Sequence, residues 1–200
     1  MGKELGMVRP RRWLRTVAVV GTSLALVMVT GASARAGTGT LVDNFEASNA
    51  NSVWTDEHGS TGYVEYSSTA HSLTHQGWMF RPNYGGWVSL GRSVHLPITL
   101  SPYLYGPSCS ASIWIRPLGT SKFNVEVIRP SDWTYIALKT VTIGTAGGGY
   151  QPYQQITVPS WVPATGDVFF RVSQVYLNDV SLGAQIDDLN VTCSWTDYRR

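Results

Sequence analysis

The sequence lacks a convincing helical period after its first 36 residues, and it lacks the short motifs of several enzyme classes. No Gly-x-Ser-x-Gly elbow occurs. The run Gly147-Gly148-Gly149 precedes no helical segment, so it predicts a turn and not a phosphate-binding loop. No internal repeat or linker divides residues 37–200. These absences argue against a helical protein, an α/β-hydrolase and a nucleotide-binding domain.

Hydrophobic runs long enough to cross a membrane are absent as well. The apolar run from Val17 to Ala32 is too short, and too often interrupted by Gly, Thr and Ser, for a comfortable span. It follows four arginines and precedes Ala34-Arg35-Ala36, which places small residues at the −3 and −1 positions of a cleavage site. We therefore expect residues 1–36 to be a secretory signal peptide. Residues 37–200 should form one secreted, extracellular domain with no membrane attachment, acting as a monomer.

An excess of positive charge is missing from the part of the chain that we expect to be secreted. The whole chain has 15 basic and 13 acidic residues, a formal net charge of +2. Six of the basic residues and one of the acidic residues lie within residues 1–36, so the net charge of the remainder is 9 − 12 = −3. The expected secreted part therefore lacks the positive charge that would favour binding to a nucleic acid.

Cysteine is scarce, and the two that occur are Cys109 and Cys193. In a secreted chain they predict one disulfide. This bond would close a loop of more than 80 residues, which in the chain-entropy model stabilises the fold by roughly 4 kcal/mol. The 164 residues after the signal can bury roughly 70% of their unfolded surface, enough for a core that needs no further bridges.

Short β-branched and aromatic runs alternate with Gly, Pro, Ser and Asn about every eight to twelve residues, which is typical of an all-β sandwich or barrel. The expected strands are Thr40–Glu46, Tyr63–Tyr66, His71–Leu73, Trp78–Phe80, Trp87–Leu96, Cys109–Arg116, Phe123–Ile128, Tyr135–Ile143, Tyr153–Val158, Val168–Val175 and Gln185–Cys193.

Alternation within these strands predicts which residues form the core. One face carries apolar side chains and both cysteines, and successive strand residues point to opposite faces. The expected core residues are Cys109, Ala111, Ile113, Ile115, Phe123, Val125, Val127, Ile156, Val158, Val168, Phe170, Val172, Leu189, Val191 and Cys193.

The opposite faces combine aromatic rings with amides, guanidinium groups and a carboxylate. Rings stack on the apolar C–H side of a sugar, and planar polar groups bind its hydroxyls. We therefore predict a concave sheet face that binds a polysaccharide or another glycan. Its expected residues are Trp114, Arg116, Asn124, Glu126, Tyr153, Gln155 and Arg171. The alternative is that a second layer or a long loop covers this face and that its Arg–Glu pairs are satisfied internally.

Further tryptophans lie in or beside the expected loops. Trp87 and Trp133, with Tyr84, would form a second sugar contact at the edge of the sandwich if their rings are exposed. Trp54 and Trp161 fit equally well as buried plugs at the ends of the sandwich.

Two adjacent carboxylates, Asp187 and Asp188, stand where the last strand leaves its turn. Carboxylate oxygens in such a place suit a hard cation such as calcium. The pair His71 and His75 has no further ligands close in sequence, so surface or loop histidines are expected there in place of a zinc site.

Five short segments carry a family resemblance, and together they span nearly all of residues 37–200. They are Asp43–Glu46 followed by Trp54, Trp87–Val94, Ser112–Arg116, Phe170–Val172 and Ile186–Leu189. In these segments the chain resembles the calcium-dependent jelly-roll carbohydrate-binding modules, galactose-binding-like sandwiches that are attached to secreted glycoside hydrolases.

The resemblance implies a jelly-roll sandwich of two antiparallel sheets, a polysaccharide ligand and no catalysis by the module itself. It also implies one structural calcium bound by Glu46 and Asp187, with Asp188 as the competing ligand. Such modules usually accompany a catalytic domain, and we expect none within residues 37–200.

Other classes of function have weaker support. A small glycoside hydrolase would use a carboxylate pair such as Glu65 and Glu126, whose separation the sequence does not give. A polysaccharide lyase would place a His beside Tyr153 and Arg116, and no His is expected on that face. A cell-surface interaction protein would expose a large apolar patch.

Overall fold

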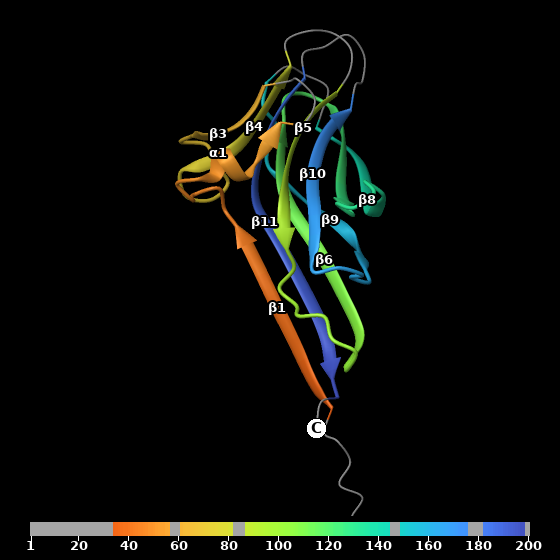
Figure 1. Ribbon diagram of the computed structural model, residues 1–200. Helices are drawn as coiled ribbons and strands as arrows, with labels where there is room; N and C mark the ends of the chain where they lie inside the picture. Colours follow the sequence, from red (N-terminus) through yellow and green to blue (C-terminus); the bar gives the residue numbers. More distant parts are fainter. Residues whose placement is uncertain (1–33, 57–60, 82–86, 145–148, 176–181, 199–200) are drawn as a thin grey trace, which may run out of the picture. The chain divides into compact units, whose positions relative to one another are not determined.

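The computed structural model describes residues 34–56, 61–81, 87–144, 149–175 and 182–198 (Figure 1). The predicted signal peptide lies outside these residues except for its last few positions. Of these, Arg35 and Ala36 belong to the first strand, β1 (Arg35–Asp43). In the described part of the chain, no helix is long and apolar enough to cross a membrane.

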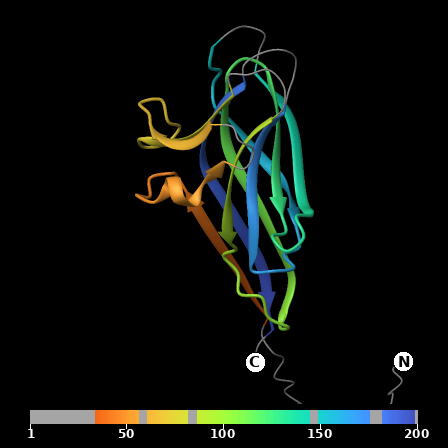
Figure 2. The same cartoon turned by 45° about the horizontal axis from the view of Figure 1, so that its top comes forward.

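The strands form two antiparallel sheets, as the strand pattern predicts for a β-sandwich and as the family resemblance implies (Figures 1 and 2). Sheet A has the order β3-β4-β11-β6-β9, with β1 also paired to β11, and sheet B has the order β2-β5-β10-β7-β8. In sheet A the other strands are β3 (Thr61–Tyr66), β4 (His75–Arg81), β6 (Leu104–Pro117), β9 (Gln154–Trp161) and β11 (Leu182–Asp197). Sheet B contains β2 (Thr55–Asp56), β5 (Trp87–His95), β7 (Ser121–Ile128), β8 (Tyr135–Ile143) and β10 (Asp167–Val175).

The last strand, β11, organises sheet A. Along one edge it pairs with β6. Along the other edge its first residues pair with β4 and its later residues pair with β1, which Figure 1 shows running beside it. A β-bulge between Asp187 and Asn190 adds a residue to β11, and Asp188 has a left-handed φ of 49°. The bulge keeps Leu189 turned inward and gathers two carboxylates at one point of the strand.

The core lies between the two sheets and contains every residue that the alternation predicts. Phe123, Val125 and Val172 have no exposed surface, and Ile156, the most exposed of the predicted set, retains 7%. Trp54 and Trp161 are also buried in the core, so neither ring is an exposed sugar contact. The inward faces are mostly apolar, and the buried polar residues Gln174 and Ser121 hydrogen-bond to each other, so burial of these faces fixes the register of both sheets.

Three local expectations are wrong. His71–Leu73 is a loop and not a strand, because its backbone turns to bring donors to carboxylates of the neighbouring segments. Phe45 and Glu46 lie beyond the end of β1, where Phe45 adopts a left-handed φ of 63°. A one-turn helix, α1 (Ala50–Val53), follows, and it had no sequence signal.

The two cysteines form the predicted disulfide. Cys109 of β6 and Cys193 of β11 are directly paired in sheet A and both side chains are buried in the core. The bond spans 84 residues of sequence, so it links the middle of the chain to β11, the strand with which β1, β4 and β6 all pair.

Removing this bond should weaken the fold without changing it. For Cys109→Ala/Cys193→Ala we expect a loss of about 4 kcal/mol in the free energy of unfolding, because the unfolded chain regains the freedom of a long loop. Equilibrium urea denaturation of the oxidised parent and the double variant measures the difference. A loss below about 1 kcal/mol would show that the pairing of β6 with β11 restricts the chain without the bond.

Candidate functional site

The predicted sugar-binding residues do not share one face, which corrects the expectation of a single platform. All of them except the loop residue Tyr153 lie on strands and point away from the core, as expected. However, β6 and β9 belong to sheet A whereas β7 and β10 belong to sheet B. The outer face of sheet A therefore receives Trp114, Arg116, Tyr153 and Gln155, and the outer face of sheet B receives Asn124, Glu126 and Arg171.

On the outer face of sheet A, the predicted stacking ring is already covered. The His71 ring lies parallel to the Trp114 indole, with centroids 3.9 Å apart and an interplanar angle of 19°. His71 also contacts Tyr153 edge-on at 5.3 Å. A sugar would have to displace the imidazole to reach that side of the indole.

The polar groups of this face are satisfied by one another. Arg116 donates to the carbonyl of Gln151 and to Oε1 of Gln185, and its guanidinium lies over the Tyr150 ring. Tyr153 donates its hydroxyl to the buried Gln76 at 2.8 Å. Gln155 is exposed and its one described contact is a 3.3 Å hydrogen bond to Ser112. This face therefore resembles the covered layer that the sequence left as an alternative.

The same contacts bring a histidine to the place where the sequence predicted none, since His71 lies between Trp114 and Tyr153. A lyase would need the tyrosine hydroxyl as an acid or base. Burial, and then the charge of Asp187, raise the pKa of Tyr153 above its usual range, and its hydroxyl is engaged with Gln76. The arrangement does not favour proton transfer to a substrate at neutral pH.

The outer face of sheet B has a buried polar floor. The Arg171 guanidinium donates through Nε to Oε2 of Glu126, and Ser173 donates to the same oxygen at 3.3 Å. Glu126 is 1% exposed and Arg171 is 6% exposed. Neither charged group is presented to solvent as a direct sugar ligand, because each is committed to the other. Asn124 is half-buried and accepts a hydrogen bond from Thr140.

Two exposed rings stand over this floor. Trp133 and Tyr135 are 55% and 56% exposed. The Trp133 ring packs at 5.4 Å against Phe169, and the Tyr135 hydroxyl lies 3.5 Å from Nη2 of Arg171. Phe169 and Arg171 are two residues apart on β10 and point outward, so both exposed rings lie on the outer face of sheet B.

Hydrogen bonds within the turn between β7 and β8 define the backbone conformation at Trp133. Backbone hydrogen bonds join Arg129 to Thr134 and Trp133 to Arg129, both at 2.9 Å. Asp132 accepts hydrogen bonds from Arg129 and from both donors of Thr134. Trp133 itself has a left-handed φ of 56°, a costly conformation for an aromatic residue. The turn thus maintains an exposed indole at the cost of local strain.

Two other candidates are separated or lie outside the described structure. Glu65 projects from the outer face of sheet A and Glu126 from that of sheet B, so they cannot act together as a glycosidase pair. The backbone of Trp87 begins β5, but its side chain is not among those described, and Tyr84 also lies outside the described residues.

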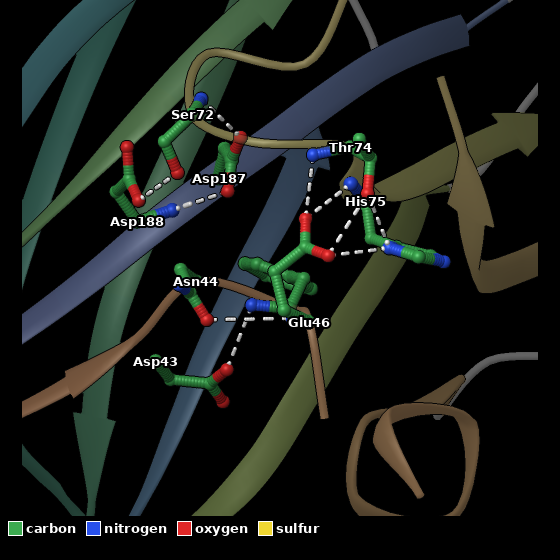
Figure 3. A network of polar contacts seen from close by, with 9 residues as sticks. Asp43, Asn44, Glu46, Ser72, Thr74, His75, Asp187 and Asp188 are labelled. Carbon is green, nitrogen blue, oxygen red and sulfur yellow. Dashed lines mark hydrogen bonds and ion pairs between the residues drawn. The ribbon is translucent and has the colours of Figure 1, made fainter. Parts of the chain in front are cut away.

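The carboxylates predicted to bind calcium contact the segment from Ser72 to His75 (Figure 3). Glu46 accepts hydrogen bonds from the backbone N–H groups of Thr74 and His75, both at 2.6 Å, and from their side chains. Although desolvation opposes it, this set of donors lowers the pKa of Glu46 to about 2. Glu46 is therefore ionised throughout the physiological range.

Asp187 and Asp188 differ in their surroundings, although they are adjacent. Asp188 is bound by the Ser72 hydroxyl and by Nδ1 of His71 at 2.6 Å. Asp187 is fully buried, and it accepts from the backbone N–H groups of Ser72 and Asp188. Burial raises the pKa of Asp187 to about 6, and the charge of Asp188 adds to the rise.

The carboxylate oxygens of Glu46 and Asp187 are of the ligand type that calcium prefers. Glu46, after the first strand, and Asp187, in the last, both accept hydrogen bonds from residues 72–75, and no Lys, Arg or His side chain in the described residues forms an ion pair with Asp187. No group of three or more Asp, Glu, His or Cys side chains is placed to hold a metal in the described part of the chain. An ion bound by Glu46 and Asp187 would therefore take its remaining ligands from backbone and water oxygens. Calcium binding stays a prediction.

Comparisons with known proteins give a fold but no sequence family. No protein-family model and no curated protein sequence matches the chain. Among solved structures, the chain is similar to an arabinose-bound α-L-arabinofuranosidase, MgGH51, with a TM-score of 0.57 and 12% identity. The match covers 78% of this chain and 26% of the arabinofuranosidase, so the chain spans about a quarter of that enzyme's length.

Two further structures match over most of their own length. The K2 cleaved adhesin domain of Lys-gingipain has a TM-score of 0.55 and 15% identity, with 76% of this chain and 97% of that domain covered. The carbohydrate-binding module TmCBM61, in complex with β-1,4-galactotriose, has a TM-score of 0.50 and 17% identity, with 74% and 92% covered. The chain therefore has the jelly-roll fold of structures that include a carbohydrate-binding module, as the resemblance implied.

Proposed function

We propose that this protein is a secreted, non-catalytic glycan-binding module that contacts a polysaccharide through the outer face of sheet B. The observation that carries the proposal is the pair of exposed rings, Trp133 and Tyr135, held over the outward residues of β10. The fold it shares with TmCBM61, which was solved with a galactotriose, supports the choice of ligand class.

The two rings and the floor have separate roles in this proposal. The rings offer apolar faces to the C–H side of sugar residues, and Asn124 with Thr140, further along β7 and β8, offers hydrogen-bonding groups. Glu126 and Arg171 act as positioning residues, because their buried ion pair places Nη2 of Arg171 against the Tyr135 hydroxyl. This revises the predicted direct contact of these two residues with the sugar.

The proposal predicts that Trp133→Ala weakens polysaccharide binding. Soluble xylan, β-glucan and galactan are titrated into the parent protein by calorimetry, and the variant is compared on whichever polymer binds. We expect the affinity to fall by about tenfold or more, because removing a central aromatic contact at a binding surface commonly costs more than 1 kcal/mol.

Matched controls locate the surface. Tyr66 on β3 of sheet A is 72% exposed, so Tyr66→Ala removes an even more accessible ring from the other sheet and should leave the affinity unchanged. Loss of binding in Trp114→Ala, with binding intact in Trp133→Ala, would move the site to sheet A and refute the proposed face. New reducing ends or unsaturated products after incubation with the same polymers would refute the non-catalytic assignment.

A structural calcium bound by Glu46 and Asp187 forms part of the proposal, and Asp187→Asn tests it. An ion that binds only the folded state raises the melting temperature, by roughly 5–10 °C when calcium is at about a hundred times its dissociation constant. We expect this rise in the parent, its reversal by EDTA and its absence in Asp187→Asn.

Asp188→Asn is the matched control for calcium, because His71 and Ser72 already bind that carboxylate. This variant should keep the calcium-dependent rise. A parent protein whose thermal transition is the same in calcium and in EDTA would rule out the ion.

A further inference from the structure

A small cavity lies at the corner where the chain passes from β1 into α1, away from the two exposed rings. Its volume is about 170 Å³, and it is lined by Asp43, Ala47, Asn49, Ala50, Val53 and Arg92. Ala47 and Asn49 are exposed, so the cavity opens to solvent beside them. Pockets that enclose drug-sized ligands measure roughly 300–1,000 Å³, so this one suits a single small ring or a group of similar size.

An ion pair forms the inner wall of the cavity. Arg92 donates through Nη1 to Oδ2 of Asp43 and through Nε to the carbonyl of Ser93. The same Asp43 oxygen accepts the indole N–H of Trp54 at 2.9 Å, and the other oxygen accepts the backbone N–H of Phe45. These contacts fix both charged groups in place before any ligand arrives.

Several polar atoms of the cavity have no partner in the described part of the chain. Nη2 of Arg92 donates no hydrogen bond to the residues described, while the guanidinium lies 5.8 Å from the centroid of the Trp54 ring and its side chain is 19% exposed. Asn49 precedes α1, yet its side chain makes no capping hydrogen bond. One donor group and one amide are therefore available to a ligand, and Oδ1 of Asp43 keeps a second lone pair.

The paired charges of Arg92 and Asp43 determine which chemical class of ligand the cavity can bind. The Asp43 carboxylate would repel an anion that approached the guanidinium, and the Arg92 guanidinium would repel a cation that approached the carboxylate. A neutral hydroxyl can accept from Arg92 and donate to Asp43 at once, since it carries both a donor and acceptors. The methyl groups of Ala47, Ala50 and Val53 provide an apolar side for C–H groups.

We propose that this cavity, the Arg92 cavity, binds one neutral sugar residue through adjacent hydroxyls held by Arg92, Asp43 and Asn49. The proposal is separate from the sheet B surface: it assigns a second, single-residue site to the corner between β1 and α1. A site of this size should bind a free monosaccharide with a dissociation constant on the order of millimolar.

The Trp54 indole N–H signal reports on the cavity separately from the sheet B surface in an NMR titration. The Trp54 indole donates to Asp43 at the cavity wall, whereas the exposed Trp133 indole belongs to the sheet B surface. The Trp133→Ala protein is titrated with galactose, arabinose, xylose and glucose. We expect the Trp54 signal to shift saturably with at least one of them, because binding changes the surroundings of Asp43.

Two exposed neighbours supply a variant and its control. Ala47→Leu fills the cavity from its solvent side, so it should weaken the monosaccharide affinity by about tenfold or more. Ser48→Leu adds the same side chain at an exposed position that does not line the cavity, and it should bind as the parent does. Matching thermal transitions of the two variants would show that both are folded.

Each other outcome has a defined meaning. A Trp54 signal that no sugar moves would overturn the Arg92 cavity, and it would leave the sheet B proposal standing if Trp133 still responds to polysaccharide in the parent. An equal shift with sodium acetate or inorganic phosphate would show an anion site and would also overturn the proposal. Sugar binding that survives Ala47→Leu would place the ligand elsewhere.

Discussion

The structure depends on the pairing of β11 with strands from three distant parts of the chain. Its two edges bind β1, β4 and β6, and the Cys109–Cys193 bond locks it to β6 inside the core. A strand with partners on both edges cannot shift without moving the apolar side chains of the whole sheet out of register. The β-bulge at Asp187 and Asp188 is therefore held firmly, and the loop from His71 to His75 docks on carboxylates whose positions are fixed.

The sequence contained enough information for the layers and the core. Strands that are covered on one side must alternate, so the parity of residues such as Ile113, Phe123 and Val191 could be assigned locally, and all three are buried. The disulfide followed from composition, because a chain expected to be secreted contains only two cysteines. Neither prediction required knowledge of which strands pair, and both are confirmed.

Which sheet a strand joins was not predictable in this way. Both sheets of a sandwich bury one face, so β6 and β7 show the same alternation, yet β6 pairs with β11 in sheet A and β7 with β10 in sheet B. That difference is set by partners far away in sequence, and it divided the predicted sugar-binding residues between two faces. The docking of His71 on Asp188, 117 residues away, had no local signal either.

The two outer faces differ in how completely their polar groups are satisfied, and this decides where a ligand can bind. On sheet A, Arg116, Tyr153 and Trp114 each have protein partners, so a sugar would replace contacts that already exist. On sheet B the charged groups are paired beneath the surface, and the rings above them retain more than half of their area for a ligand. Because binding free energy is the surplus over the contacts and water lost, a ligand should prefer the face whose rings are still open. The strained turn that keeps Trp133 exposed is explained if that ring has a partner outside the protein.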